Sequence, residues 1–150
     1  MGDNTKAALV DNLNGLLADS FALYIKTKNF HWHVRGPQFR DLHLLFDEQA
    51  AEVFALTDLI AERVRKNGAA TLTSLGTIAA RAQLTDQDDA TLDAPAMIRE
   101  LIADNETYLA KLRETKESAS AAGDNATDGV IDDWTDQCEQ RIWFLKQTAA

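Results

Sequence analysis

A long, uninterrupted run of helical periodicity limits the folds open to this chain more than any other feature. Between Phe39 and Val64 the apolar residues fall three or four positions apart, and the stretch contains neither glycine nor proline. Their positions are 39, 42, 46, 50, 53, 56, 60 and 64. Because this spacing gives a helix one apolar face, we predict a single long helix after Pro37 that packs against other helices.

The residues before this helix predict an antiparallel neighbour for it. A first helix is expected from an N-cap at Asn4 or Thr5 to about Val34. Its apolar stripe holds Leu9, Leu13, Leu16, Leu17, Tyr24 and Ile25. Gly36 and Pro37 interrupt the pattern, and the proline suits the first turn of the next helix. A connection this short makes the two helices neighbours.

A long connection follows the second helix. Asn67 and Gly68 predict the end of that helix. Residues 69–92 are a mixed stretch that could hold one short helix near 75–82. The length of the stretch favours a crossover along the bundle over a tight hairpin.

Two more helices are predicted after the crossover. The third opens at Asp93 and Pro95 and dissolves in residues 118–125, and Asp124 or Asn125 caps the fourth. Their apolar faces are formed by Ile98, Leu101, Ile102, Leu109 and Leu112 in the third helix and by Ile131, Trp134, Cys138, Ile142 and Leu145 in the fourth.

Four helices with one long crossover describe an all-α fold, a ferritin-like four-helix bundle. We expect residues 1–150 to form a single domain, because a chain of this length can bury a sizeable core. The net charge of −9 favours attraction of cations over attraction of DNA phosphates. With no bilayer-length apolar run and no signal-peptide pattern, we expect a cytoplasmic protein without a membrane partner. Cys138 is the single cysteine, and its place on an apolar stripe predicts a buried, inert thiol.

The second helix carries a histidine and three spaced carboxylates. At about 100° per residue, Asp47, Asp58 and Glu62 lie about 40°, 60° and 100° around the helix from His43, so all four share one face. His43 with Asp47, and Asp58 with Glu62, are each one turn apart and can hold one ion. A rise of about 1.5 Å per residue separates Asp47 from Asp58 by about 16 Å, whereas two cooperating metal ions lie only about 3.5–4 Å apart. The two pairs therefore cannot meet within one chain.

These pairs are arranged symmetrically about the point between Glu52 and Val53. His43 and Glu62 are equally far from it, and so are the two aspartates. If two copies of the helix cross antiparallel at this point, each His/Asp pair faces the Asp/Glu pair of the other copy. His31, near the end of the preceding helix, can complete each site across the short turn. Two imidazoles and three carboxylates suit iron, manganese or zinc, so we predict a metal site.

Each of these residues also has an ordinary structural explanation. A single histidine on a helix more often packs or lies at the surface than binds a metal, and His/Asp pairs one turn apart arise by chance on acidic helices. The joint pattern reverses that balance in favour of a metal site. His33 points about 200° around the helix from His31, so we interpret it as structural. Trp32 on its own fits a packing role.

The same segment carries a family motif. H-W-x-V-x-G-x-x-F-x-x-L-H-x-x-F-D, followed by D-x-x-x-E, resembles the ferroxidase signature of the Dps family, the miniferritins named as DNA-binding proteins from starved cells. The match is complete at the metal positions, and the length and helix plan extend it over essentially the whole chain. The resemblance implies that His31, His43 and Asp47 come from one subunit and Asp58 and Glu62 from its two-fold mate.

The resemblance also implies an activity and an assembly. The family forms twelve-subunit shells that oxidise Fe(II) to Fe(III), preferably with hydrogen peroxide, and store it as a mineral, which protects against oxidative damage. Trp32 would lie beside the iron site. Asp124, Asp128 and Asp132 would line acidic three-fold pores for Fe(II), with Asp133 as a substitute for Asp132. Solvated acids that match the dipole of a helix N-terminus explain these residues equally well.

Two other functions fit parts of the sequence. One is a nucleoid-associated protein that compacts DNA and has an incidental metal site; the other is a bundle without metal function that binds partner proteins. Family members that bind DNA usually do so through basic tails. Here Lys6 is the only basic residue among the first twenty, and only Lys146 follows Arg141. We therefore expect an iron-storing homo-oligomer that uses Fe(II) and hydrogen peroxide as substrates and does not bind DNA.

Overall fold

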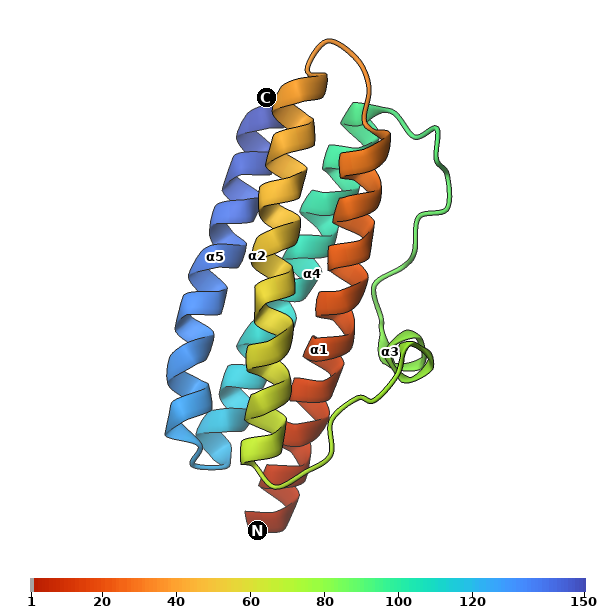
Figure 1. Ribbon diagram of the computed structural model, residues 1–150. Coiled ribbons are helices and arrows are strands. Elements are labelled where there is room, and N and C mark those ends of the chain that lie inside the picture. The colour runs from red at the N-terminus through yellow and green to blue at the C-terminus, as the bar shows by residue number, and fades with distance from the viewer. Residues whose placement is uncertain (1) are drawn as a thin grey trace.

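The computed structural model describes residues 2–150, and the side chains of residues 4–150. Within this part of the chain there are five helices and no strand: α1 (Gly2–His33), α2 (Phe39–Lys66), α3 (Leu75–Arg81), α4 (Ala94–Ala121) and α5 (Asn125–Ala149). The four long helices lie side by side in Figure 1, and α3 is set against the flank of α1. The predicted all-α four-helix bundle with a short helix in its crossover is confirmed.

The connections explain the order of the helices in space. α1 and α2 run antiparallel across a short turn, and so do α4 and α5 (Figure 1). The segment between α2 and α4 passes along the whole length of the bundle, so these two helices point in the same direction (Figure 1). None of the helices within residues 2–150 is long and apolar enough to cross a membrane.

The start of α1 differs from the prediction. The helix already includes Gly2, so neither Asn4 nor Thr5 is its N-cap. Because the helix begins before both residues, their preference for the N-cap position has no effect here.

The turn before α2 also differs in detail. Pro37 precedes the helix instead of lying in its first turn, and Gln38 takes the N-cap position without a side-chain hydrogen bond. Gly36 has a φ of 115°, which is left-handed backbone that favours glycine. Its carbonyl oxygen accepts a hydrogen bond from the amide of Phe39 at 3.0 Å. This tight turn brings the end of α1 beside the start of α2.

The third long helix is longer than its sequence indicated. α4 continues through the serine-rich stretch to Ala121 and ends before Gly123, whose φ is 72°. Packing explains the extra turn: Ala119 is buried, and the Ser118 hydroxyl accepts a hydrogen bond from the Asn12 side chain at 2.5 Å. Tertiary contacts thus compensate for the weak helix propensity of serine.

The core lies between the four long helices. Its largest fully buried side chains include Tyr108, Phe30, Phe46, Leu9, Leu13, Leu16, Leu23, Leu42, Leu56, Ile60, Met97 and Leu101. Burial of each such side chain contributes about 1.5–3 kcal/mol relative to exposure. Ile25, which the sequence pattern placed on the core stripe of α1, is instead 56% exposed. Its side chain lines an open groove between α1 and α3.

One polar cluster crosses this core. The buried Asn105 side chain donates a hydrogen bond to the Leu101 carbonyl at 2.8 Å and accepts one from Arg141 Nε at 2.8 Å. Arg141 is itself buried, and its Nη1 pairs with Glu52 at 2.5 Å. The Cys138 thiol donates to the Asn105 carbonyl at 3.2 Å, and burial raises the pKa of that thiol to about 11. The predicted burial of the cysteine is confirmed.

Two buried charges on α1 hold the crossover in place. The Asp19 carboxylate accepts hydrogen bonds from the amides of Gln83 and Leu84 at 2.7 and 3.0 Å. Lys26 donates to the Thr85 carbonyl oxygen at 3.0 Å. These contacts fix the segment that follows α3 along the side of α1.

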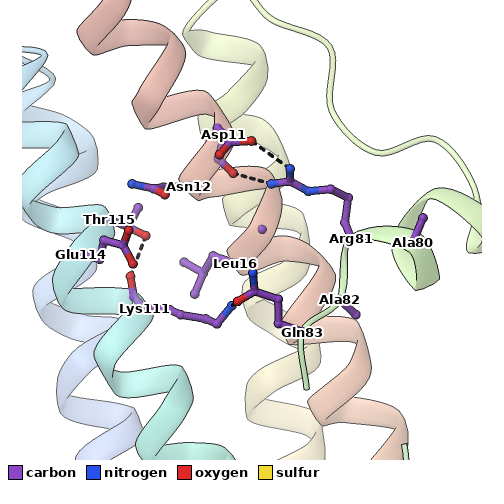
Figure 2. A pocket seen from close by; sticks show the side chains of 11 residues that line it. Asp11, Asn12, Leu16, Ala80, Arg81, Ala82, Gln83, Lys111, Glu114 and Thr115 are labelled. Carbon is purple, nitrogen blue, oxygen red and sulfur yellow. Dashed lines mark hydrogen bonds and ion pairs between the residues drawn. The ribbon is translucent and has the colours of Figure 1, made fainter. Parts of the chain in front are cut away.

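α3 itself is attached through its last residue (Figure 2). Arg81 donates to the carboxylate and the carbonyl oxygen of Asp11, at 2.8 and 2.7 Å. Gly15 lies beneath the guanidinium, where a Cβ would approach Arg81 Nη2 to 3.2 Å. A pocket of about 460 Å³ opens between α1, α3 and α4 at this point, and it contains none of the predicted metal ligands.

Candidate metal centre

The turn between α1 and α2 brings His31 and His43 face to face. Their rings stack with centroids 3.9 Å apart and an interplanar angle of 14°. His31 Nδ1 lies 2.6 Å from the carbonyl oxygen of His43, and His43 Nδ1 lies 2.7 Å from the carbonyl oxygen of His31. Because a carbonyl oxygen only accepts, both Nδ1 atoms carry a proton, and in the neutral imidazole each Nε2 then has its lone pair. This is the arrangement by which metal-binding histidines are oriented.

Asp47, one turn after His43, joins this pair. Its Oδ1 atom lies 3.7 Å from His31 Nε2 and accepts a hydrogen bond from Lys28 Nζ at 2.8 Å. The Lys28 hydrogen bond holds the pKa of the Asp47 carboxyl below its ordinary value. The acid therefore stays ionised, and two imidazoles and a carboxylate meet at one end of the bundle.

The other aromatic and histidine side chains of this region differ in role. Phe39 stacks on the His43 ring with centroids 5.0 Å apart. Trp32 is 60% exposed, and its ring lies 5.8 Å from Lys28 Nζ.

His33 lies apart from this cluster. Its side chain is exposed, and Nδ1 lies 2.9 Å from the carbonyl oxygen and 2.7 Å from the side-chain oxygen of Asn29. These contacts stay within the last turn of α1, in agreement with the structural role that we predicted for this residue.

Asp58 and Glu62 form a separate pair near the other end of α2. Both side chains are exposed. Hydrogen bonding with Asp58, together with the negative charge of that residue, raises the pKa of the Glu62 carboxyl. Two carboxylates this close repel each other, and the charge of Lys66 offsets that repulsion only in part. The pair is thus able to attract a cation.

A single chain does not bring the two halves together. Among the residues that the structure describes, no three histidine, cysteine, aspartate or glutamate side chains are placed to hold one metal ion. The rise of an α-helix puts Asp47 about 16 Å from Asp58. That one chain carries two incomplete half-sites stays a prediction.

Asp124, a predicted pore residue, is held at the junction of α2 and α5. Its carboxylate caps α5 through the Thr127 amide at 3.1 Å and accepts hydrogen bonds from Arg63 at 2.9 and 3.0 Å and from Asn67 at 2.9 Å. Burial opposes its charge, but the hydrogen bonds from Thr127, Asn67 and Arg63 outweigh that cost and lower the pKa of the Asp124 carboxyl. The structure gives this acid a stabilising role.

The other two predicted pore acids share a cation. Lys116 of α4 pairs with Asp128, and with Asp132 at 2.8 Å. These two hydrogen bonds raise the pKa of Lys116. Asp133, the alternative to Asp132, is exposed.

The sequence analysis did not recognise two partners of the histidine cluster, namely Lys28 and Phe39. The positions could have indicated both: Lys28 precedes His31 by three residues and Phe39 precedes His43 by four, so each lies on the ligand face of its helix. The reciprocal bonds between imidazoles and main-chain carbonyls had no signal in the sequence, because they depend on the turn geometry.

Comparison with known proteins agrees with this fold. Residues 10–150 match the family model of the ferritin-like domain. A DNA protection during starvation protein from Brevibacillus brevis is 30% identical over 134 residues, which cover 89% of this chain and 89% of that protein.

Solved structures lead to the same family. The X-ray structure of Dps from Thermosynechococcus elongatus superposes with a TM-score of 0.96 at 32% identity and covers 99% of this chain and 94% of that one. Dps from Vibrio cholerae O1, described as a member of a broad superfamily of ferritin-like diiron-carboxylate proteins, has a TM-score of 0.91 at 26% identity, with coverage of 98% and 92%. The chain belongs to the Dps family of ferritin-like proteins.

Proposed function

We propose that this protein takes up Fe(II), oxidises it to Fe(III) at sites between two copies of the chain, and stores the ferric product inside a closed shell. Membership of the ferritin-like fold and the Dps family supports iron storage and protection of DNA as the general function. The mutual orientation of His31 and His43 is the observation that carries the proposal, because it leaves two Nε2 lone pairs free beside the Asp47 carboxylate.

A second copy is needed to complete each site. His43 and Glu62 are equally distant from the point between Glu52 and Val53, so a two-fold axis there brings the two kinds of half-site together. Each dimer would then hold two identical sites. His31, His43 and Asp47 would come from one copy and Asp58 and Glu62 from the other.

The surface around this axis supports the pairing. Phe54 is next to the midpoint, lies about 20° around α2 from His43, and is 50% exposed. Beside it, a mostly apolar groove of about 750 Å³ runs between α1 and α3. Ile25 and Leu75 line the groove, and Leu75 is 84% exposed. Exposed apolar surface of this extent marks an interaction site, and the symmetry of α2 makes a second copy the occupant.

The donor set suits the substrate. Two neutral imidazoles and three carboxylates accept Fe(II), and Mn(II) or Zn(II) would compete for the same donors. Oxidation by hydrogen peroxide needs two electrons, so two Fe(II) ions and two protons convert one peroxide into two waters and leave two Fe(III). Delivery of both electrons from one site avoids release of hydroxyl radical. Trp32, which follows His31 in the sequence, would take a stray oxidising equivalent.

Family membership supports a shell with an entry route for Fe(II). A twelve-subunit shell would enclose the mineral, and acidic pores near the start of α5 would admit Fe(II). Asp132 is a better candidate for the pore lining than Asp124, because its side chain is 67% exposed. The Asp124 side chain is 12% exposed, and Arg63 and Asn67 already bind its carboxylate.

Removal of iron and peroxide would protect DNA without contact with it. The net charge of −9 opposes binding to a phosphate backbone, and the α1 start and the end of α5 offer few basic groups. A gel-shift assay at low salt and without divalent metal tests this part, and clear retardation of duplex DNA would contradict it.

A complementation experiment tests the intersubunit site. One variant combines His31→Gly with His43→Gly, and the other combines Asp58→Asn with Glu62→Gln. Each variant alone should lack fast peroxide-dependent Fe(II) oxidation. When the two are dissociated and reassembled together, each mixed dimer contains one intact site, so random pairing should restore about a quarter of the wild-type rate.

The result separates the two possible arrangements. Recovery in the mixture, with the correct native mass, requires that ligands come from both copies. If the mixture stays as inactive as its components although mixed dimers form, the site is not shared. If either variant alone keeps the wild-type rate, the ligands are misassigned.

A further inference from the structure

Helix α3 stands apart from the other helices of the described chain, because none of its side chains is buried. It has seven residues and lies outside the four long helices in Figure 1. Its last residue, Arg81, pairs with Asp11, and these two side chains are 38% and 68% exposed. Isolated helices this short are unstable in water, and exposed ion pairs contribute little to stability. A single chain therefore gives α3 little to keep it folded.

The chain on either side of α3 is held more firmly. Before the helix, the Thr71 hydroxyl donates a hydrogen bond to the Asn14 side chain at 2.9 Å. After it, the amides of Gln83 and Leu84 donate to the fully buried Asp19 carboxylate. Leu84 is buried as well. Since all these contacts lie outside α3, the helix can unfold while both of its ends stay in place.

A glycine inside α3 weakens the helix further. Gly76 lies in its first turn, and glycine is among the poorest helix formers. Space does not require a glycine, because a Cβ at this position would meet only the Ser74 hydroxyl oxygen outside the helix backbone, at the ordinary contact distance of 3.9 Å. The backbone does not require it either, because Gly76 is not among the glycines with positive φ. An alanine here would favour the helical state about fivefold.

The face of α3 toward the groove of about 750 Å³ is apolar. Leu75, Ile78 and Ala79 line this wall, and Leu75 is 84% exposed. From α1 and α2 the groove is lined by Ile25 and Phe54, which are 56% and 50% exposed. In a single chain this wall faces water, whereas a second copy seated in the groove would bury it. Such burial is the main source of stability for a short helix.

We propose that α3 folds stably only when two copies of the chain pair, so that the partner completes this helix. The inference rests on the pairing proposed for the metal site. In the single chain, residues 75–81 interconvert between a helix and an unfolded segment that stays attached at both ends. Pairing covers Leu75 and selects the helix. Only the folded form offers the wall that the partner contacts, so the folding equilibrium of α3 sets part of the pairing affinity.

Hydrogen exchange, resolved to single amides by fragmentation in the mass spectrometer, tests this coupling on the assembled wild type and on Phe54→Glu. The charge in Phe54→Glu should give single chains, which light scattering verifies. The amides of Ile78 and Ala82 donate hydrogen bonds to the carbonyl oxygens four residues earlier. In single chains we expect both to exchange at least tenfold faster than in the assembly. The Leu84 amide, bonded to Asp19, is the internal control and should stay protected in both states.

Gly76→Ala, added to Phe54→Glu, tests the coupling in the opposite direction. Exchange of the α3 amides in single chains should become about fivefold slower. The concentration at which the chains associate should fall by up to about 25-fold, because each pair contains two copies of α3. Gly129→Ala makes the same change on an exposed part of α5, where a Cβ meets nothing within 4 Å, and should alter neither quantity.

Two results would overturn the inference and leave the pairing surface in place. One is equally slow exchange of α3 in single chains and in the assembly, and the other is a Gly76→Ala variant that associates no more readily. A wild-type native mass for Phe54→Glu would instead contradict the pairing itself and remove the inference with it. Ile25→Glu, on the α1 wall of the groove, replaces Phe54→Glu if circular dichroism shows that the bundle has not folded.

Discussion

His31 and His43 fix each other, because the ring Nδ1 of each residue donates a hydrogen bond to the main-chain carbonyl of the other, at 2.6 and 2.7 Å. The two rings thereby span the turn between α1 and α2 and present Nε2 with its lone pair. One interaction thus orients the proposed ligands and joins two helices. Replacement of these residues should affect both chemistry and stability.

We expect the double variant His31→Gly with His43→Gly to lose fast peroxide-dependent Fe(II) oxidation. It should also unfold more easily, since each lost hydrogen bond costs about 1 kcal/mol. Stopped-flow absorbance of Fe(III) formation measures the first effect, and thermal unfolding measures the second. His33→Gly is the matched control, because His33 bonds only within its own helical turn and should keep the full rate. Wild-type oxidation in the double variant would remove both histidines from the ligand set.

Removal of a ligand from the carboxylate half-site should abolish metal binding without loss of stability, unlike removal of the two histidines. The Glu62 carboxyl has a raised pKa because of Asp58, so the charged pair opposes folding at neutral pH, and this cost disappears as protonation proceeds at lower pH. Glu62→Gln should therefore leave the melting temperature of the metal-free protein equal or higher at pH 7, while Fe(II) binding is lost. Scanning calorimetry with and without metal measures both. A clear drop in the metal-free melting temperature would mean that Glu62 has a stabilising partner instead.

Pairing of the chains should depend on Phe54. This half-exposed ring lies beside the proposed two-fold axis and stacks with Tyr24 at a centroid distance of 4.8 Å. Phe54→Glu puts two charges near the axis, so the native mass should fall and Fe(II) oxidation should decrease with it. Ala110→Glu, on an exposed part of α4, is the control and should keep the wild-type mass. Light scattering measures the mass, and an unchanged mass in Phe54→Glu would place the contact elsewhere.

The sequence predicted most of the fold because its helices carry strong local signals. The α2 apolar period and the Asn67/Gly68 stop reproduce the helix that the structure has, and so does Asp93 as the N-cap of α4. The errors fall where tertiary contacts outweigh local preference. Ile25 has the period of a core residue, yet its side chain is 56% exposed in the groove between α1 and α3.

The sequence could predict which residues form the candidate site, but not how they contact one another. The spacing of His43 and Asp47 along one helix indicated that both face the same way, and the structure brings them together with His31. Lys28 and the imidazole–carbonyl bonds depend on how two helices meet across a turn, which a one-dimensional pattern does not contain. The lowered pKa of the Asp47 carboxyl results from its hydrogen bond with Lys28, so it could be recognised only in the structure.

The buried thiol offers a simple test of core integrity. Burial raises the pKa of Cys138 to about 11, so almost none of it is thiolate at pH 8. We expect the native protein to react with a thiol reagent at a rate limited by opening of the bundle, and the denatured protein to react at once. Absorbance of the released chromophore measures the rate, and fast labelling of the native protein would show that α5 separates readily from the core.

The junction of α2 and α5 should give the protein a defined sensitivity to acid. Asp124 accepts bonds from Arg63, Asn67 and Thr127, which lower the pKa of its carboxyl despite burial. A lowered pKa means that the ionised form stabilises the fold above the ordinary aspartate pKa of about 4, and that this stability is lost as pH falls below it. Asp124→Asn should cost about 1.5–3 kcal/mol at pH 7, the range for hydrogen bonds to a charged group. Urea unfolding of both proteins should give curves that converge as pH falls below about 4, and a difference that stays constant down to the lowest pH would mean that the charge of Asp124 does not matter.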